Sequence, residues 1–405
     1  MSDHHRSWSD LPPDLLHTIS NRLALFSDHI RLRAVCRHFR LSIPAAPLRL
    51  PPQLPWLMLP HSSDRRRCCF YDLVKEKVHF VKVVGISAPR RVCCESHGWL
   101  VVFSESPEVF CFNPLTKSKV HLPPLSAFPH VIDFSFNNVG REYLIQRWMG
   151  FKLSCDLKHM RDSFVKKVVL SSSPDGRDDW FAVAIMCYTG EMVYCDGKDG
   201  ESWKLVDARF FSCEEGFFSC EDVIYDKGLF YGVDKHGWIA MLDLRNRVEG
   251  AVVQLKVVEA PESFGGDVVY LVKLKDDLLM VSRILDAHCE LDGTMFHKTI
   301  RFEVYKLDWS LLRWDVVKEL GDYALFLGQN SSLSLSASLY GGCRGNRIYF
   351  TDDLSENTSN GDWRYHDMGV FNLKNHRIKP LVSYWENSEC TPMWVTPNPC
   401  MRDPF

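Results

Sequence analysis

The sequence predicts a mainly β protein that carries a small helical module at its N-terminus. Over residues 11–40 the apolar side chains recur with the helical period, whereas from Trp56 onward they alternate with the period of two that is typical of strands. Gly, Asp, Asn and Pro divide this second part into many short runs, and no helical pattern alternates with them. Such a chain forms antiparallel sheets, arranged as a sandwich, a barrel or a propeller.

The first predicted helix begins near Pro13. Proline is tolerated in a first helical turn, and Asp14 places a carboxylate where the helix dipole favours it. Apolar residues then follow at i, i+1, i+4 and i+8, namely Leu15, Leu16, Ile19 and Leu23. Because these positions share one face, the segment is predicted to be an amphipathic helix.

A second helix is predicted after Ser27 and Asp28, either of which can serve as its N-cap. Its apolar face recurs at i, i+3, i+4 and i+7, at Leu32, Val35, Cys36 and Phe39. Two helices of this length cannot bury their apolar residues against each other alone, because a unit below about 40 residues usually needs a metal, a disulfide or a partner. The remaining apolar surface must therefore pack on the rest of the chain or on another protein.

The two helices together resemble an F-box. The pattern LPxxLLxxIxxRL begins at Leu11, DxxRxRxVCRxFR follows from Asp28, and the resemblance covers residues 7–46, with Phe39 where the family usually has tryptophan. The resemblance implies that the module binds the Skp adaptor and, through it, the cullin of a Skp–cullin–F-box ubiquitin ligase. The adaptor contacts that it implies are Leu11, Pro12, Leu15, Leu16, Ile19, Leu23, Leu32, Val35 and Cys36.

Five prolines lie between residues 44 and 55. They prevent a helix from continuing and favour an extended polyproline conformation. We therefore predict a stiff, proline-rich linker over residues 47–55, between the helical module and the β-rich region. An ordinary surface connection is the alternative.

The β-rich region repeats one pattern: a turn led by Gly or Asp, an apolar strand, a second turn and an aromatic-rich strand. The pattern occurs at residues 98–115, 228–244, 277–308 and 347–373. Two of its copies begin 49 residues apart, at Leu229 and Leu278. Units of this size with about four strands are typical of a β-propeller. We predict a propeller over residues 56–400 with about six blades, while five or seven stay open because residues 125–163 show no clear repeat.

Several segments of this region also resemble the plant F-box-associated β-propeller family of the KIB type. They include CESHGWL at 94–100, FNPLT at 112–116, LVKLKDDLLMV at 271–281 and NRIYFTDD at 346–353. The resemblance spans nearly all of residues 52–400. It implies a propeller fold and a plant source.

The two ends of the β-rich region are similar to each other. PWLMLP at 55–60 and PMWVTP at 392–397 are both short, bracketed by prolines and built around a tryptophan. A propeller must join its first and last blades, because otherwise two sheet edges would expose unpaired backbone groups. We therefore predict that these segments lie in the same or adjacent blades. A free C-terminal tail is the alternative.

The sequence contains no catalytic signature among the glycine-loop, HExxH and GxSxG motifs. Acidic pairs such as Asp352-Asp353 lie between predicted strands, where Asp stabilises turns by bonding nearby backbone, so we interpret them as turn residues. The fifteen cysteines are odd in number and lack paired metal-ligand spacings. We expect no enzymatic activity, no metal and no cofactor.

Charge and hydropathy exclude two further classes of protein. A net charge of −3 argues against a nucleic-acid binder, whose binding domain would be strongly basic. No apolar run approaches the length of a membrane span, and the polar N-terminus MSDHHRSWSD lacks the apolar core of a signal peptide. We expect a protein of the cytoplasm, the nucleus or both, without membrane contact.

These expectations describe a substrate receptor. The F-box would bind the Skp adaptor, and the propeller would present a target protein for ubiquitination. The alternative is a propeller interaction module that sequesters or inhibits a partner without ubiquitination. No residue pattern identifies the target or the propeller face that would bind it.

Overall fold

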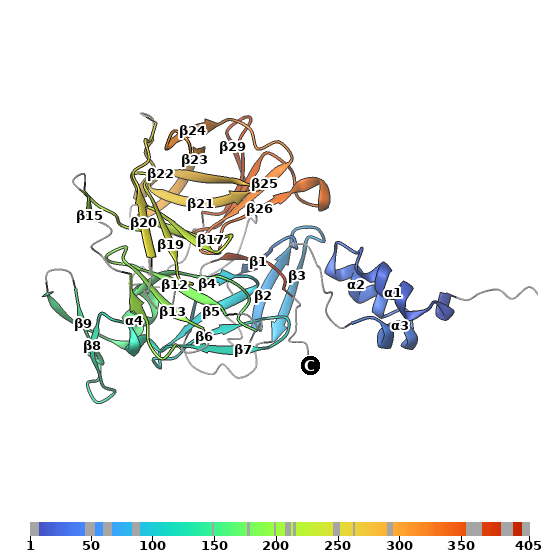
Figure 1. Cartoon of the computed structure of the whole chain (residues 1–405), viewed down its shortest axis with the longest axis horizontal. Helices are drawn as coiled ribbons and strands as arrows, with labels where there is room; N and C mark the ends of the chain where they lie inside the picture. The colour runs from blue at the N-terminus through green and yellow to red at the C-terminus, as the bar shows by residue number, and fades with distance from the viewer. Residues whose placement is uncertain are drawn as a thin grey trace, which may run out of the picture.

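The protein consists of three N-terminal helices beside a large β-structure (Figure 1). The computed structural model describes residues 8–44, 53–59, 67–82, 90–147, 150–175, 179–197, 200–206, 212–213, 216–245, 252–261, 264–289, 295–353, 367–381 and 392–398. Most of the predicted linker lies outside the described residues, which include only its last part, residues 53–55. None of the helices in these ranges is long and apolar enough to cross a membrane.

The helical module has one helix more than the sequence predicts. A short 3₁₀ turn, η1 (Trp8–Asp10), precedes α1 (Pro13–Ser20), which starts where predicted. The second predicted helix is divided into α2 (Phe26–Arg33) and α3 (Arg37–Ser42). The prediction of one continuous helix is wrong because Cys36 has extended backbone, with φ −157° and ψ 172°, and its sulfur accepts a hydrogen bond from the Phe39 N–H to begin α3.

The predicted N-cap of α2 is also wrong. The helix begins after Leu25, and neither Ser27 nor Asp28 caps it by a side-chain hydrogen bond. Asp28 lies instead in the first turn, where its carboxylate is favoured by the helix dipole and pairs with Arg31 at 2.7 Å. The helix therefore starts about one turn earlier than the polar residues suggested.

The β-structure contains six sheets of four or five strands within the described residues, and we call these sheets blades. Blade 1 comprises β30 (Met393–Val395), β1 (Trp56–Leu59), β2 (Arg67–Asp72) and β3 (Lys77–Lys82). Blade 2 comprises β4 (Arg90–Ser96), β5 (Trp99–Ser104), β6 (Val109–Phe112) and β7 (Lys119–Leu122). Blade 3 comprises β11 (Val165–Leu170), β12 (Phe181–Met186), β13 (Met192–Asp196) and β14 (Lys204–Leu205).

The remaining blades come from the C-terminal half of the chain. Blade 4 comprises β17 (Asp222–Asp226), β18 (Leu229–Val233), β19 (Ile239–Asp243) and β20 (Val252–Lys256). Blade 5 comprises β21 (Val268–Leu274), β22 (Asp277–Cys289), β23 (Met295–Asp308) and β24 (Arg313–Val317). Blade 6 comprises β26 (Leu333–Ser336), β25 (Tyr323–Leu327), β27 (Arg347–Phe350), β28 (Gly369–Asn372) and β29 (Arg377–Pro380).

The blades follow one another around a ring. The end strands β30, β4, β11, β17, β21 and β26 contact one another in this order and surround the centre. A separate apolar cluster fills each of the six interfaces between neighbouring blades, including the one that joins blade 6 to blade 1. This cyclic packing confirms the predicted propeller of about six blades.

The first and last strands of the ring pair directly. β1 and β30 are antiparallel, with Leu57 opposite Trp394 and Met58 opposite Met393. The prediction that the two proline-bracketed segments lie in the same or adjacent blades is therefore confirmed, and they share blade 1. This pairing joins the first and last segments of the β-structure in one blade.

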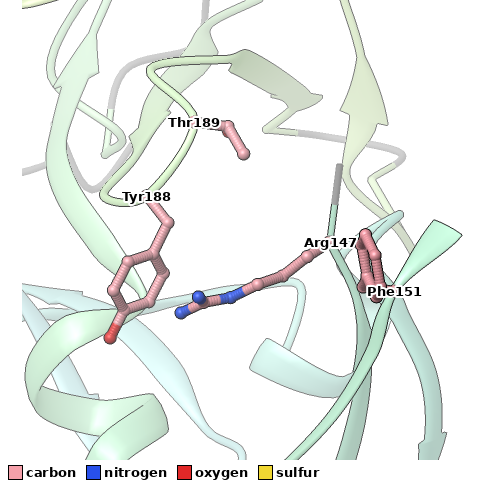
Figure 2. Close-up of a pocket in the computed structure, with 4 residues that line it drawn as sticks. All are labelled: Arg147, Phe151, Tyr188 and Thr189. Carbon is pink, nitrogen blue, oxygen red and sulfur yellow. The ribbon is translucent and has the colours of Figure 1, made fainter. Parts of the chain in front are cut away.

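The segment without a clear repeat forms an insertion between blades 2 and 3. After the turn η2 (Leu125–Ala127), it contains a three-stranded sheet, β8 (Val131–Phe134), β9 (Tyr143–Gln146) and β10 (Lys152–Cys155), followed by α4 (Leu157–Ser163). A pocket of about 350 Å³ lies beside it, lined by Arg147, Phe151, Tyr188 and Thr189 (Figure 2). Two further short elements are the hairpin β15 (Ser212–Cys213) and β16 (Gly216–Phe217) and the turn η5 (Ala337–Leu339).

Candidate binding surfaces of the helical module and the propeller

The helical module exposes several large apolar side chains. Leu15 is 47% exposed and Ile19 37% exposed, and because they are four residues apart they lie on the same side of α1. Val35, in the turn between α2 and α3, is 62% exposed. Pro12 is also exposed, and Leu23 is half-buried. Large apolar side chains that the module does not cover are available to a partner.

The other predicted adaptor contacts form the core of the module. Leu16 is fully buried and packs with Phe39 and Ile43. Leu11, Leu32 and Cys36 are half-buried against this cluster. The structure therefore separates the predicted residues into a group that holds the helices together and a group that faces outward. Two further exposed residues, Ile30 on α2 and Leu41 on α3, were not predicted.

A buried glutamine joins the helical module to the chain that enters the propeller. The Gln53 side chain donates to the Ala24 carbonyl and accepts from the Phe26 N–H, both at 2.9 Å. Leu25, between these two positions, packs against the apolar cluster of blades 6 and 1, which includes Leu54. These contacts hold the turn between α1 and α2 against the start of blade 1. Sequence patterns missed them because a single glutamine carries no periodic signal.

The centre of the propeller is crossed by a segment of blade 6. After β25 the chain reaches Asn330, which is buried and forms a bridge with Glu95 of blade 2. The Ser331 N–H donates to the Glu95 carbonyl at 2.7 Å. Because blades 2 and 6 are not neighbours in the ring, this segment connects the two across blade 1.

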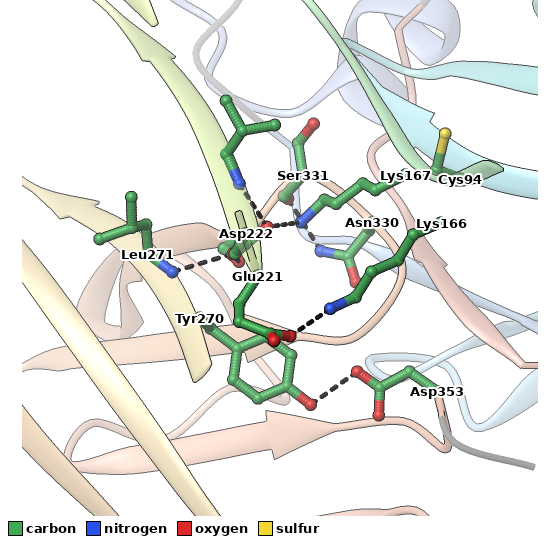
Figure 3. Close-up of polar contacts among 12 residues, drawn as sticks. Cys94, Lys166, Lys167, Glu221, Asp222, Tyr270, Leu271, Asn330, Ser331 and Asp353 are labelled. Carbon is green, nitrogen blue, oxygen red and sulfur yellow. Dashed lines mark hydrogen bonds and ion pairs between the residues drawn. The ribbon is translucent and has the colours of Figure 1, made fainter. Parts of the chain in front are cut away.

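Charged side chains from the inner strands pair with one another near this segment (Figure 3). The Lys167 ammonium of β11 contacts the Asp222 carboxylate of β17 at 2.5 Å, and both residues are buried. The second oxygen of Asp222 accepts from the Leu271 N–H of β21 at 2.9 Å. Lys166 and Glu221 form a neighbouring pair, also at 2.5 Å. Blades 3, 4 and 5 are thus tied together at the centre.

A buried arginine makes the corresponding link between blades 5 and 6. The Arg283 guanidinium on β22 donates to the Asp353 carboxylate at 2.8 Å and to the Asp367 carboxylate at 2.9 Å. The Tyr270 hydroxyl donates to Asp353 at 2.7 Å. The interpretation of Asp353 as a turn residue is therefore wrong, because its partners lie about 70–80 positions earlier in the sequence, where local pattern cannot reveal them.

Glu95 is a buried carboxyl of this region that forms no ion pair with a described residue. Burial raises its pKa to about 8, although its carboxylate accepts a hydrogen bond from the Gly98 N–H at 2.6 Å. The side chain is therefore mostly protonated at neutral pH. Within the described residues, no group of three or more His, Cys, Asp or Glu is arranged to hold a metal ion.

The charged groups at the centre connect neighbouring blades to one another. Each lysine and arginine described above has a carboxylate partner on a neighbouring blade, and such pairs are expensive to break once they are buried. These contacts link blades 3, 4, 5 and 6 in turn and connect blade 6 to blade 2.

Family models match both parts of the chain. The F-box domain model matches residues 8–44, and the KIB1-4 beta-propeller model matches residues 70–372, which is most of the chain. The chain belongs to the KIB1-4 β-propeller family. In this KIB1-4 protein the two resemblances seen in the sequence are confirmed, and their order along the chain agrees with the helices and blades of the structure.

Relatives that are named as F-box proteins occur in Arabidopsis thaliana. F-box protein SKIP23 is 25% identical over 96% of this chain and 95% of its own length. F-box protein At2g26160 is 24% identical over 86% of this chain and 96% of its own length. Among solved structures, the β-propeller domain of Myceliophteria thermophila Cps50 (Swd1) matches at 8% identity over 84% of this chain and 88% of that chain, with a TM-score of 0.34, a likeness too loose to bear on the argument.

Proposed function

We propose that this KIB1-4 protein is the substrate-recognition subunit of a Skp–cullin–F-box E3 ubiquitin ligase. The observation that carries the proposal is the helical module, which matches an F-box and leaves Leu15, Ile19 and Val35 outside its own core. An apolar surface of this kind needs a partner, and the Skp adaptor is the partner that an F-box binds. The receptor would act in the cytoplasm, the nucleus or both.

The helical module and the propeller would bind different partners. We assign adaptor binding to the outward-facing residues Pro12, Leu15, Ile19 and Val35, with Leu23 beside them. Leu11, Leu16, Leu32 and Cys36 would support that surface from the core of the module. The propeller would bind a target protein and would have no catalytic role of its own, since the ubiquitin-conjugating enzyme is held elsewhere on the cullin scaffold.

The contacts of Gln53 support this division of labour. Ubiquitin transfer requires the target to be held at a defined distance and orientation from the conjugating enzyme. A flexible joint between F-box and propeller would weaken that control, whereas the two hydrogen bonds of Gln53 and the packing of Leu25 restrict it. The joint is therefore suited to presenting a bound target in a constant position.

Copurification with a Skp adaptor and a cullin tests the proposal. The full-length chain, coexpressed with both, should elute with them as one complex in size-exclusion chromatography. A chain that lacks residues 8–44 should elute alone while its propeller stays folded. If the full-length chain also elutes alone, the ligase role is wrong, and a propeller that sequesters its partner becomes the better explanation.

A further inference from the structure

The pocket beside the insertion is formed by two parts of the chain. Arg147 and Phe151 come from the connection between β9 and β10, whereas Tyr188 and Thr189 come from the turn between β12 and β13 of blade 3. Its volume, about 350 Å³, falls within the range of roughly 300–1,000 Å³ that is usual for ligand pockets. The pocket is thus large enough to admit a few side chains of a bound peptide.

The strand pattern explains why Arg147 reaches this place. Tyr143 and Ile145 alternate along β9 toward the core between blades 2 and 3, where both are buried. Arg147 follows with the same spacing, just past the end of the strand, and its N–H donates to the Phe151 carbonyl at 2.7 Å. The inward face of the insertion therefore extends past the apolar core and ends at the pocket.

Arg147 has no anionic partner among the residues that the structure describes. Its guanidinium lies 4.2 Å from the ring centroid of Tyr188, and Figure 2 shows it extending toward that ring. The Tyr188 hydroxyl is itself engaged with His159 Nε2 at 2.7 Å. Among the described residues, Arg147 forms no ion pair, and its Nε is buried without a hydrogen-bond acceptor. Buried polar groups in proteins are normally paired, and no acceptor for this Nε lies among the described residues.

The pocket also presents apolar surface next to this charge. Phe151 is 70% exposed and Tyr188 is 43% exposed. Exposed aromatic side chains beside an arginine are the residue types that dominate the energetics of protein–protein interfaces. A ligand that fits must therefore combine one anionic group with a neighbouring apolar group.

We propose that this pocket binds a segment of the target protein in which an acidic side chain stands next to a bulky apolar one. This inference rests on the proposed function, since it names the surface on which the receptor holds its target. The Asp or Glu carboxylate would pair with Arg147, and the apolar side chain would pack on Phe151 and Tyr188. A carboxylate suits the pocket better than a phosphate, because phosphate recognition generally uses a cluster of arginines and Arg147 is the one basic residue among the four that line it.

Selection from a random peptide library tests the inference on the full-length chain. Selected peptides should share an Asp or Glu beside an aromatic or aliphatic residue. Arg147→Gln should weaken their binding by at least about tenfold, because a charge-assisted hydrogen bond is lost. Arg377→Gln, which removes an exposed arginine on β29 of blade 6, should leave binding unchanged.

A double-mutant cycle identifies the partner of Arg147. Replacing the acidic residue of a selected peptide with its amide should weaken binding to the natural chain but should have little further effect on the Arg147→Gln variant. A phosphoserine at the same position should bind no better than the natural Asp or Glu. If the phosphopeptide binds more than about tenfold more tightly, the carboxylate assignment is wrong.

A loss of binding must be separated from a loss of folding. Arg147→Gln should keep the thermal unfolding temperature of the natural chain, since no described residue hydrogen-bonds to its guanidinium. Phe151→Asp provides a second variant at an exposed position, and it should repel acidic peptides. A selection that yields no peptide dependent on both residues overturns the inference. In that case the ligase role would still stand if the adaptor and cullin copurify with the chain. If instead the selected peptides depend on both residues but the adaptor and cullin do not copurify, the pocket assignment would stand and the ligase role would be wrong.

Discussion

Leu57, on the first strand of the propeller, pairs in antiparallel register with Trp394, on the last. Trp394 is buried against Phe326 and Tyr349 of blade 6, with ring centroids 5.2 Å and 6.2 Å away. The last strand therefore completes blade 1 and also supplies part of the interface with blade 6. Loss of this strand would expose both surfaces at once.

Truncation before β30 should destabilise the whole ring. A chain that ends at residue 389 should unfold at a clearly lower temperature than the full-length chain, in one shifted transition, because the opened ring loses a strand and a core tryptophan. Trp394→Ala alone should cost about 3–5 kcal/mol of unfolding free energy. A chain that ends at residue 398 keeps β30 and is the control. Equal melting temperatures for the full-length chain and both truncated chains would show that β30 does not contribute to closure of the ring.

Outward-facing and inward-facing aliphatic residues of α1 should differ in what their replacement does to adaptor binding and to folding. Replacing Leu15 and Ile19 together with Asp should weaken adaptor binding by at least about a hundredfold, because each buried aliphatic side chain contributes about 1.5–3 kcal/mol. Folding of the module should be retained, since both side chains lie outside its core. Calorimetric titration with the purified Skp adaptor measures the loss.

Leu16→Asp should also lose adaptor binding, but through unfolding. The substitution places a carboxylate in the core of the module and should therefore unfold the helices. Val74→Asp, at an exposed apolar position of the propeller, should change neither folding nor adaptor affinity. Full adaptor affinity in the Leu15 and Ile19 double variant would contradict the assignment of this surface.

The stability of the propeller should depend on pH through Glu95. Its pKa of about 8 in the folded state lies above the value of about 4.3 for a glutamate in an unfolded chain. The folded state therefore holds a proton that the unfolded chain releases. This contribution to stability is fully present below about pH 4.3 and is lost as the pH rises through 8.

Glu95→Gln should remove this dependence, since an amide stays neutral. Relative to the variant, the natural chain should lose on the order of 3 kcal/mol of unfolding free energy between about pH 5 and pH 8. Urea denaturation of both proteins across this range measures the difference. Parallel stability curves would mean that Glu95 does not titrate in this window.

Arg283 should be critical for the stability of the propeller. Arg283→Met would leave the carboxylates of Asp353 and Asp367 without their cation, and breaking a buried pair in this way costs about 3–5 kcal/mol. Arg301→Met, on β23 of the same blade, should cost less than about 1 kcal/mol because its ion pair with Glu303 is largely exposed. Denaturation midpoints of the two variants provide the comparison, and equal midpoints would contradict the structural role of Arg283.

Much of the fold follows from local patterns that a sequence displays directly. Helical periodicity located α1, and turn residues between short apolar runs indicated the repeated strands. The similar ends at Trp56 and Trp394 even indicated ring closure, because a strand that pairs once and then stops needs a short apolar core and a proline at each side. These features depend on residues that are close together in the sequence, and a sequence pattern shows such residues directly.

Other features were decided only by tertiary contacts. Leu15 and Leu16 are adjacent and equally apolar, yet one faces outward and the other lies in the core, since the packing of α3 against α1 determines which side of the helix is covered. The pairing of Arg283 with Asp353 and the meeting of Arg147 with Tyr188 likewise join residues from distant segments. The sequence by itself determined α1, the repeated strands and the family. The folded structure determined where α2 ends and α3 begins, which side chains pair at the centre of the ring and which stay exposed at its surface. Those contacts form only when remote parts of the chain are brought together.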